Sequence, residues 1–425
     1  MSFLYIDPGT GSMLFAVLVG IFSVAVYLVR TAFVKIKFLF SAGKTDGNIS
    51  RQSFAVFSEG KRYWNVFKPI CDEFEKRGEK LLYLTSSEDD PAFQEGYKNI
   101  EVKYIEQGNK AFLRLNVLKA DIVLSTTPGL DVYQWKRSRE VKKYIHVLHA
   151  PSDLTLYRMF GLDYYDAVLL SGDYQEKQIR ELERIRNLPA KDLRMVGITY
   201  LDALLKRYQA EPQTEKDGKT TVLLAPSWGK NAIFSKYRSR IIESLLNTDY
   251  RIIIRPHPQS YTSEKEIMDD IMSRFPESDR IHWDRSSDNF ESLKKADILI
   301  SDFSGIIFDF ALVFDRPVIY TEPNFDKAVY DAWWLEEEPW TFGALEKIGI
   351  VLNDDRINNL CEVVEEGLSS TRLKKGRAEI RKETWTNIGK AAESTVDYCI
   401  ELRNSLQAEK ETPEKSKNDK RGELA

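Results

Sequence analysis

The sequence is poor in the residues that most often bind metals or form redox pairs. It contains three cysteines and four histidines among 425 residues. Cys71, Cys361 and Cys399 are far apart and have neither metal-binding nor redox spacing. The histidines form no H-x-x-x-H or H-E-x-x-H pair. We therefore expect no disulfide scaffold, no protein-bound metal and no cofactor.

An excess of positive charge is also lacking. The chain has 61 basic and 65 acidic residues, which gives a net charge of -4. This balance gives no reason to expect nucleic acid as a partner. The length and mixed composition are typical of a globular protein with two or three domains.

Charge is absent from one stretch near the N-terminus. Met13–Val29 (MLFAVLVGIFSVAVYLV) has no charged residue, and the uncharged sequence extends upstream to Gly9. These roughly 20 residues are enough to span a bilayer. Only Asp7 precedes them, and five basic residues follow: Arg30, Lys35, Lys37, Lys44 and Arg51.

This charge asymmetry predicts a single-pass protein of the inner or plasma membrane, with the bulk of the chain in the cytoplasm. We expect residues 1–45 to form the transmembrane helix and a juxtamembrane segment. A secretory signal peptide is the alternative, but the start of the chain lacks the Lys and Arg of such peptides.

Short apolar runs alternate with helical patterns from residue 46 to residue 209. Such alternation predicts a parallel sheet covered by helices on both faces. The expected strands are Phe54–Phe57, Leu81–Leu84, Val102–Ile105, Ile122–Leu124, Tyr144–Leu148, Val168–Leu170 and Arg194–Ile198.

A polar segment, residues 210–220, then predicts a hinge. The alternation restarts in residues 221–404, with strands expected at Val222–Ala225, Arg251–Ile254, Ile281–Trp283, Ile298–Ile300 and Val318–Tyr320. Mostly helical sequence closes this part. Residues 405–425 are charged and are expected to be disordered. The fold class is therefore α/β, with two Rossmann-like domains that face a cleft.

Polar residues that follow the expected strands are the candidate ligand-binding groups, because ligands of open parallel sheets bind at the carboxyl ends of the strands. Ser304 and Gly305 lie between a strand and a helix start, where backbone N–H groups suit a phosphate. Asp302 and Asp309 belong to the same motif. An ordinary helix cap is the alternative.

Two further loops follow strands of the second domain. Arg255 and His257 are held between prolines in R-P-H-P and would suit a pyrophosphate. A solvated loop is the alternative. Ser227 and neighbouring amides could contact phosphate or ribose, whereas Trp228 is expected to pack.

The first domain offers one candidate base. His149 lies nearer the expected strand end than His146 and is suited to take a proton from an alcohol if its pKa is near neutrality. His146 is expected to lie in the core or on the sheet face. The aromatic and acidic stretch Tyr330–Trp340 could form a lid, an acceptor-facing surface or a membrane contact.

The motifs A-P-S-W, R-P-H-P and S-D-F-S-G-I-I-F-D-F-A, in this order, resemble those of the CDP-glycerol glycerophosphotransferases of teichoic-acid synthesis. The resemblance covers mainly residues 221–322, with weaker support from 144–173. It implies a GT-B architecture. It also implies transfer of glycerol phosphate from CDP-glycerol to a polyol-phosphate chain, with release of CMP.

The resemblance also implies residue roles. His257 would contact the donor phosphates, and His149 would be the base. Asp302, Ser304 and Asp309 match the family's D-Y-S-S-x-x-F-D block. The sequence departs from the family in three places: Phe303 replaces Tyr, Gly305 replaces the second Ser, and Ala-Pro-Ser rather than Gly-Thr-Pro follows His149.

The sequence hypothesis is thus a membrane-anchored transferase of cell-envelope polymer synthesis. It would move glycerol phosphate or a similar polyol phosphate from a CDP-alcohol to a lipid-linked or polymeric hydroxyl acceptor. A GT-B glycosyltransferase with a nucleotide-sugar donor and a non-catalytic membrane-bound scaffold are the alternatives.

Overall fold

The computed structural model describes residues 51–422, except 213–217, 287, 303, 323 and 324, together with residues 19, 20, 22, 24–26 and 29. The chain divides into two compact units, Met1–Arg51 and Gln52–Ala425. The described residues of the first unit are helical and exposed. Most of the expected membrane-spanning stretch, Met13–Val29, lies outside the described residues. Among those described, no helix is both long and apolar enough to cross a membrane.

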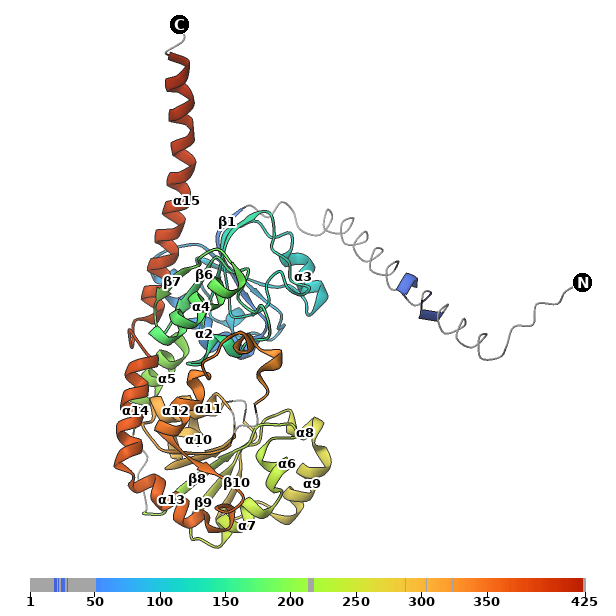
Figure 1. The fold of residues 1–425 in the computed structure, drawn as a ribbon, viewed down its shortest axis with the longest axis vertical. Helices are drawn as coiled ribbons and strands as arrows, with labels where there is room; N and C mark the ends of the chain where they lie inside the picture. Colours follow the sequence, from blue (N-terminus) through green and yellow to red (C-terminus); the bar gives the residue numbers. More distant parts are fainter. Residues whose placement is uncertain are drawn as a thin grey trace, which may run out of the picture. The chain divides into compact units, whose positions relative to one another are not determined.

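The first sheet of the larger unit has seven parallel strands in the order β3-β2-β1-β4-β5-β6-β7. Figure 1 labels β1, β6 and β7 of this sheet. All seven overlap segments that the sequence predicts as strands, although β7 shares only Arg194 and Met195 with the predicted strand Arg194–Ile198. Their bounds are β1 Gln52–Ser58, β2 Leu81–Thr85, β3 Ile100–Tyr104, β4 Ala120–Ser125, β5 Val141–His146, β6 Ala167–Leu170 and β7 Asp192–Met195.

The second sheet has six parallel strands in the order β10-β9-β8-β11-β12-β13. They are β8 Thr221–Ala225, β9 Arg251–Ile254, β10 Ile281–Trp283, β11 Ile298–Ser301, β12 Val318–Thr321 and β13 Gly349–Leu352. The sequence analysis missed β13, which pairs with β12 at the sheet edge. It follows α12 (Trp340–Ile348) directly and begins at Gly349, the residue that ends this helix.

Helices connect the strands. The α-helices described are α2 Trp64–Lys76, α3 Asn109–Leu115, α4 Asp173–Arg186, α5 Thr199–Ala210, α6 Ile233–Tyr237, α7 Arg240–Leu246, α8 Ser260–Ser263, α9 Lys265–Arg274, α10 Phe290–Lys295, α11 Ile306–Val313, α12 Trp340–Ile348, α13 Leu360–Ser369, α14 Thr371–Thr384 and α15 Ala391–Gly422. Short 3-10 helices include η1 Lys61–Tyr63, η3 Leu154–Leu156, η4 Lys327–Val329 and η5 Asp331–Trp334.

One expected helix is broken. The sequence predicts a single helix over residues 232–246, but α6 and α7 divide this segment. Arg238 separates them with a φ of 53°. A residue in this left-handed region cannot continue a right-handed helix.

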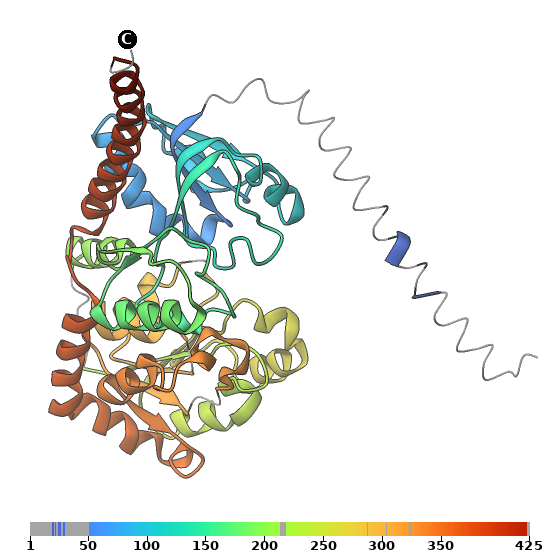
Figure 2. The same ribbon diagram turned by 45° about the horizontal axis from the view of Figure 1, so that its top comes forward.

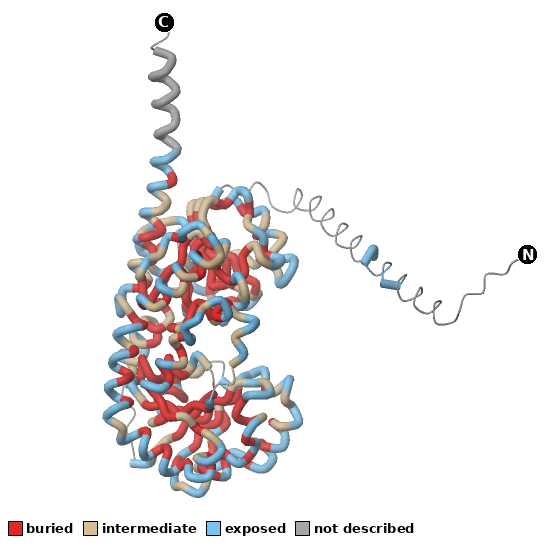
Figure 3. The backbone as a smooth tube through the Cα atoms, viewed as in Figure 1, coloured by how far each residue is buried: buried red, intermediate tan, exposed pale blue. Residues whose placement is uncertain are grey.

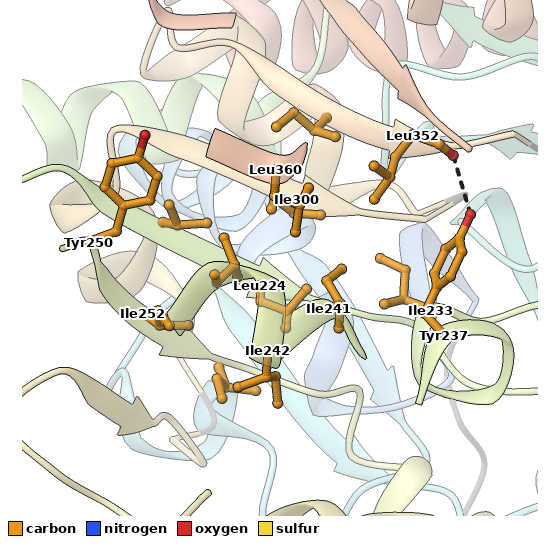
Figure 4. Close-up of a cluster of buried hydrophobic side chains, with 14 of the residues drawn as sticks. Leu224, Ile233, Tyr237, Ile241, Ile242, Tyr250, Ile252, Ile300, Leu352 and Leu360 are labelled. Carbon is orange, nitrogen blue, oxygen red and sulfur yellow. Dashed lines mark hydrogen bonds between the residues drawn. The ribbon is translucent and has the colours of Figure 1, made fainter. Parts of the chain in front are cut away.

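Buried apolar side chains cover both faces of each sheet. The buried residues gather in the interior of each domain (Figure 3). On one face of the second sheet, Leu224, Ile252 and Ile300 come from three neighbouring strands and are fully buried (Figure 4). The Tyr237 hydroxyl reaches the same layer and donates to the Leu352 carbonyl at 3.5 Å. Strands buried on both faces explain why their sequences read as continuous apolar runs.

The C-terminal part of the chain returns to the first sheet. α14 packs beside the second sheet, and α15 then runs beside the first (Figure 1, Figure 2). At the crossing, Asp202 accepts hydrogen bonds from Trp385 Nε1 at 2.9 Å and from the Ala391 amide at 3.0 Å. The structure therefore places the start of α15 on the first domain, whereas the sequence analysis assigned residues up to 404 to the second. α15 is helical to Gly422, where disorder was expected from residue 405.

Two buried carboxylates join the domains. Asp153, from the first domain, accepts from the amides of Trp340 and Thr341, each at 2.8 Å, and thereby caps α12. Asp331, from the second, accepts from the amides of Phe160 at 2.7 Å and Gly161 at 3.1 Å. Their residues are 2% and 1% exposed. Each domain thus supplies a carboxylate that accepts hydrogen bonds from backbone amides of the other domain.

A third link between the domains joins α5 to α11. The Tyr200 hydroxyl donates to the Asp309 carboxylate at 2.9 Å. Burial among apolar neighbours raises the pKa of Asp309 to about 7, although the Tyr200 hydrogen bond acts in the opposite direction. Asp309 therefore binds a proton in the folded chain at a pH where it is ionised in the unfolded chain.

This difference makes stability depend on pH. Between about pH 4 and 7 the folded state holds the extra proton, so the free energy of unfolding falls as the pH rises. Asp309→Asn removes this penalty. We compare the free energies of unfolding of Asp309→Asn and the wild type, measured in urea. From pH 5 to pH 8, we expect the difference between them to change by roughly 2–3 kcal/mol in favour of the variant.

Tyr200→Phe provides the matched variant. It removes a hydrogen bond that favours the ionised carboxylate, so the pH dependence should move to higher pH. A constant difference between Asp309→Asn and the wild type at both pH values would contradict this account of Asp309.

Candidate active site

The order of the second sheet reverses between β8 and β11. Ligands of such sheets bind beside this switch point, outside the carboxyl ends of the strands. Ser227 follows β8, and Asp302, Ser304 and Gly305 follow β11. The structure therefore brings together four of the residues that the sequence singles out.

Asp302 shapes this edge from inside the protein. It is 3% exposed, and its carboxylate accepts from the Ser227 amide at 3.0 and 2.9 Å and from the Ile233 amide at 3.1 Å. Burial raises the pKa of Asp302, while the hydrogen bonds from Ser227 and Ile233 oppose this shift. Asp302 thus holds the β8–α6 loop against β11, and this role replaces the direct ligand contact that the sequence analysis gave it.

Ser304 and Gly305 form the open start of α11. Gly305 is exposed, and a Cβ placed on it would meet nothing within 4 Å. Ser304 is half-buried, and its carbonyl accepts from the Ile307 amide at 3.2 Å. This open helix start at the switch point is the arrangement expected of a phosphate seat. Asp309, three residues into α11, instead lies in the core with Tyr200.

Arg255 does not present a free charge to this edge. Its guanidinium pairs with Asp284 at 2.6 Å and donates to the Ser286 carbonyl at 2.9 Å. The Arg255 and Asp284 side chains are 14% and 9% exposed. The pair braces the loop after β10, so Arg255 supports the site rather than offering the free fork that the sequence analysis expected.

His257, in contrast, is exposed. Its amide donates to the Pro226 carbonyl at 3.0 Å, and its Nδ1 accepts from the Gln259 amide at 3.1 Å. In the neutral ring the proton is therefore on Nε2, which can donate to a phosphate oxygen. Burial lowers the pKa of His257, and the nearby Asp302 charge opposes this shift.

Trp228 lies beside this histidine rather than in the core. The two ring centroids are 6.4 Å apart, and Trp228 is 51% exposed. The packing role expected from the sequence is therefore wrong. An exposed indole next to His257 offers an apolar face to whatever binds there.

The first sheet has a corresponding switch point between β1 and β4. His146 is the last residue of β5 and is fully buried, as the sequence predicts. Its Nε2 is 3.0 Å from the Tyr157 hydroxyl. Burial and the neighbouring His149 lower the pKa of His146 to about 3.

His149 lies three residues beyond the strand, in a loop between two tyrosines. Its ring is 5.6 Å from that of Tyr63 and 6.4 Å from that of Tyr157. Nδ1 is buried without a hydrogen-bond partner among the described residues. The ring is half-buried, and Nε2 is the nitrogen left to meet a substrate.

The pKa of His149 differs from the near-neutral value expected from the sequence. Burial and the charge of Arg62 lower it to about 4. His149 is thus neutral at physiological pH and ready to accept a proton, but it is a weaker base than an exposed histidine.

Three neighbours of His149 were not found from the sequence: Arg62, Tyr63 and Tyr157. The helical pattern predicted from the sequence begins at Tyr63 and does not include Arg62. The signal that was available is their place directly after β1, the strand beside the switch point. Tyr157 carries no such signal, because an irregular loop brings it back to His149.

The Tyr330–Trp340 segment is fixed to the first domain. The Asp331 amide donates to the Tyr157 carbonyl at 2.9 Å, and the Trp340 ring stacks on Tyr174 at 4.1 Å. Trp333 and Trp334 remain 57% and 38% exposed. The segment is therefore a bridge in this structure rather than a loose lid.

A hollow of about 750 Å³ lies elsewhere, beside β12 and β13. Its charged groups largely pair with one another, as in Arg356 with Glu366 and Lys327 with Glu338. The residues that line it do not include the loops at the switch point. In the described part of the chain, no group of three His, Cys, Asp or Glu residues is arranged as a metal site.

Comparison with known proteins adds the family. The model of the family described as CDP-Glycerol:Poly(glycerophosphate) glycerophosphotransferase matches residues 53–332. No curated protein matches the chain.

Several solved structures have the same fold. The wall teichoic acid polymerase TagF is 15% identical, with 90% of this chain and 99% of TagF covered and a TM-score of 0.53. The UDP-GlcNAc 2-epimerase of Methanocaldococcus jannaschii is 15% identical, with 81% and 99% covered and a TM-score of 0.55. MnaA of S. aureus is 15% identical, with 83% and 98% covered and a TM-score of 0.56.

At this level of identity the structural likeness shows the fold alone, and it confirms the two-domain α/β architecture of GT-B type. The family model reaches further, because it matches about two thirds of the sequence itself. This protein therefore belongs to the CDP-glycerol:poly(glycerophosphate) glycerophosphotransferase family and is an enzyme of that kind.

Proposed function

We propose that the protein transfers glycerol phosphate, or a similar polyol phosphate, from a CDP-alcohol to a hydroxyl group of a lipid-linked or polymeric acceptor in teichoic-acid synthesis. The observation that carries the proposal is a pair of histidines, one at the strand-end edge of each sheet. His149 can accept a proton, and His257 can donate a hydrogen bond. TagF, which has the same fold, is a wall teichoic acid polymerase, and this supports teichoic acid as the product.

The reaction follows from these two roles. The acceptor hydroxyl gives its proton to His149 as its oxygen attacks the β-phosphorus of the donor. The bond between the β-phosphorus and the bridging oxygen breaks, and CMP leaves with the electron pair. His257 Nε2–H and the open start of α11 at Ser304 and Gly305 stabilise the charge on the phosphates.

The other candidate residues hold the loops and helices of the site in place. Asp302 fixes the Ser227 loop, Arg255 fixes the loop after β10, and Asp309 ties α11 to α5. Preorganised loops matter here because catalysis of phosphoryl transfer depends mainly on positioning and electrostatic stabilisation.

The first prediction concerns CMP release by the full-length protein with CDP-glycerol, CDP-ribitol and a lipid-linked glycerol phosphate acceptor. We expect His149→Ala to lower kcat by on the order of 100-fold or more, because it removes the general base. His257→Ala should lower kcat/KM for the donor by a similar factor.

His282→Ala is the control for this series. His282 has a side chain that is 65% exposed and lies on β10, so its loss should leave the rate unchanged. His146 is unsuitable as a control, because it is fully buried. Full activity of both His149→Ala and His257→Ala would refute the assignment.

The second prediction concerns pH. His149 must be unprotonated to act as a base, so kcat/KM rises with pH through its pKa. Because that pKa is about 4, we expect kcat/KM to be flat from pH 8 to pH 6 and to fall only below about pH 5. A half-maximal value near pH 6.5 that is absent in His149→Ala would show instead that the pKa of His149 is not lowered.

We also propose that residues 1–45 anchor the enzyme to the cytoplasmic side of the inner or plasma membrane. In support, Phe22 and Val29 lie in helical residues and are 70% and 69% exposed. An exposed apolar helix is stable when lipid covers it.

The corresponding prediction is that removal of residues 1–45 moves the protein from the membrane fraction to the soluble fraction upon sedimentation. The unit Gln52–Ala425 is compact by itself, so the shortened protein should keep its CMP-releasing activity with a detergent-dispersed acceptor. Membrane association that survives the truncation would assign the anchoring to another part of the chain.

A further inference from the structure

We propose that Arg62 binds a phosphate group of the acceptor beside the catalytic base His149. This inference rests on the proposed function and extends it to the acceptor. It assigns a specificity-determining residue to the first domain.

The geometry links Arg62 to the base through one aromatic ring. The Arg62 guanidinium carbon lies 4.8 Å from the centroid of the Tyr63 ring. The same ring meets His149 edge-on, with the two centroids 5.6 Å apart. Arg62 and His149 thus contact the same aromatic ring, at the start of the connection that follows β1.

The guanidinium is available to a ligand. Its side chain is 71% exposed, and its acidic partner is Glu59 at 3.5 Å, a long contact for an ion pair. A surface pair of this kind contributes little, so a ligand can replace it at small cost. The adjacent Lys61 is different, because it forms a close ion pair with Asp89 in the loop after β2.

The chemistry of the acceptor fits this arrangement. In a polyol phosphate chain, the terminal hydroxyl and the nearest phosphate are separated by a single polyol unit. A base and a guanidinium that contact the same aromatic ring can therefore meet both groups of one unit. Arg binds phosphate oxygens with two parallel hydrogen bonds, which gives orientation as well as affinity.

The charge of Arg62 also affects the pKa of His149. The groups that face His149 are Tyr63, Tyr157 and Arg62, with His146 behind them. Among these, Arg62 carries the positive charge that lowers the pKa of His149. A phosphate bound to Arg62 neutralises this charge and makes His149 a stronger base when the acceptor is in place.

The test compares Arg62→Gln with Lys61→Gln in the full-length protein. Both variants lose one positive charge, at neighbouring positions. We expect Arg62→Gln to raise KM for a glycerol phosphate acceptor by about 10- to 100-fold and to leave KM for CDP-glycerol unchanged. Lys61→Gln should behave as the wild type. With glycerol, an acceptor without phosphate, Arg62→Gln should also match the wild type.

Three outcomes would overturn the proposal. The first is a wild-type KM of Arg62→Gln for the phosphate-bearing acceptor. The second is an equally large rise in KM with glycerol. The third is a rise in KM for CDP-glycerol. The last outcome would assign Arg62 to the donor. The pH profile gives an independent readout, because Arg62→Gln should raise the pKa of the acidic limb, which a purely structural role would leave in place.

Equilibrium binding separates this proposal from the proposed function. Calorimetry with a glycerol phosphate oligomer and no donor requires no turnover. Weaker binding to Arg62→Gln than to Lys61→Gln, in a protein that releases no CMP, would support the phosphate site and count against the transfer reaction. Equal binding to both variants would overturn the phosphate site, whether or not CMP is released.

Discussion

The arrangement of this enzyme depends on two buried carboxylates that exchange hydrogen bonds across the domains. Asp153 caps α12 of the second domain, and Asp331 binds the Phe160 and Gly161 amides of the first. Asp331 also pairs with Arg186, and both side chains are at most 5% exposed. Breaking such a contact leaves a buried charge unpaired, which is costly. Because Phe160 and Gly161 belong to the connection that follows His149, this link ties the His149 loop of the first domain to the second domain.

The candidate residues at the carboxyl ends of the strands divide into two groups. His149 and His257 keep a ring nitrogen that can meet a ligand. Asp302 is hydrogen-bonded by backbone amides, and Arg255 pairs with Asp284. Both residues hold the loops in place. This division has a physical reason. A site for a pyrophosphate needs donors and few free carboxylates, so an acidic residue beside it is tolerable when amides satisfy it.

Much of this fold is legible in the sequence, because strands buried on both faces give continuous apolar runs. The roles of single residues are harder to read, since they depend on partners far along the chain. Arg255 meets Asp284, and the low pKa of His149 comes from burial next to Arg62 and Tyr63. The return of α15 to the first domain rests on Asp202, which no local pattern reveals. Four residues of the family motifs follow β8 and β11, the two strands at the switch point, because the motifs lie directly after predictable strands.

The central claim is that the acceptor oxygen attacks phosphorus rather than carbon. The most direct measurement uses CDP-glycerol labelled with radioactive phosphorus at the β-position and follows the label after turnover. The account predicts that the label moves into the acceptor polymer and that unlabelled CMP is released. Label that stays with the nucleotide as CDP would show attack at carbon, as in a glycosyltransferase, and would contradict the account.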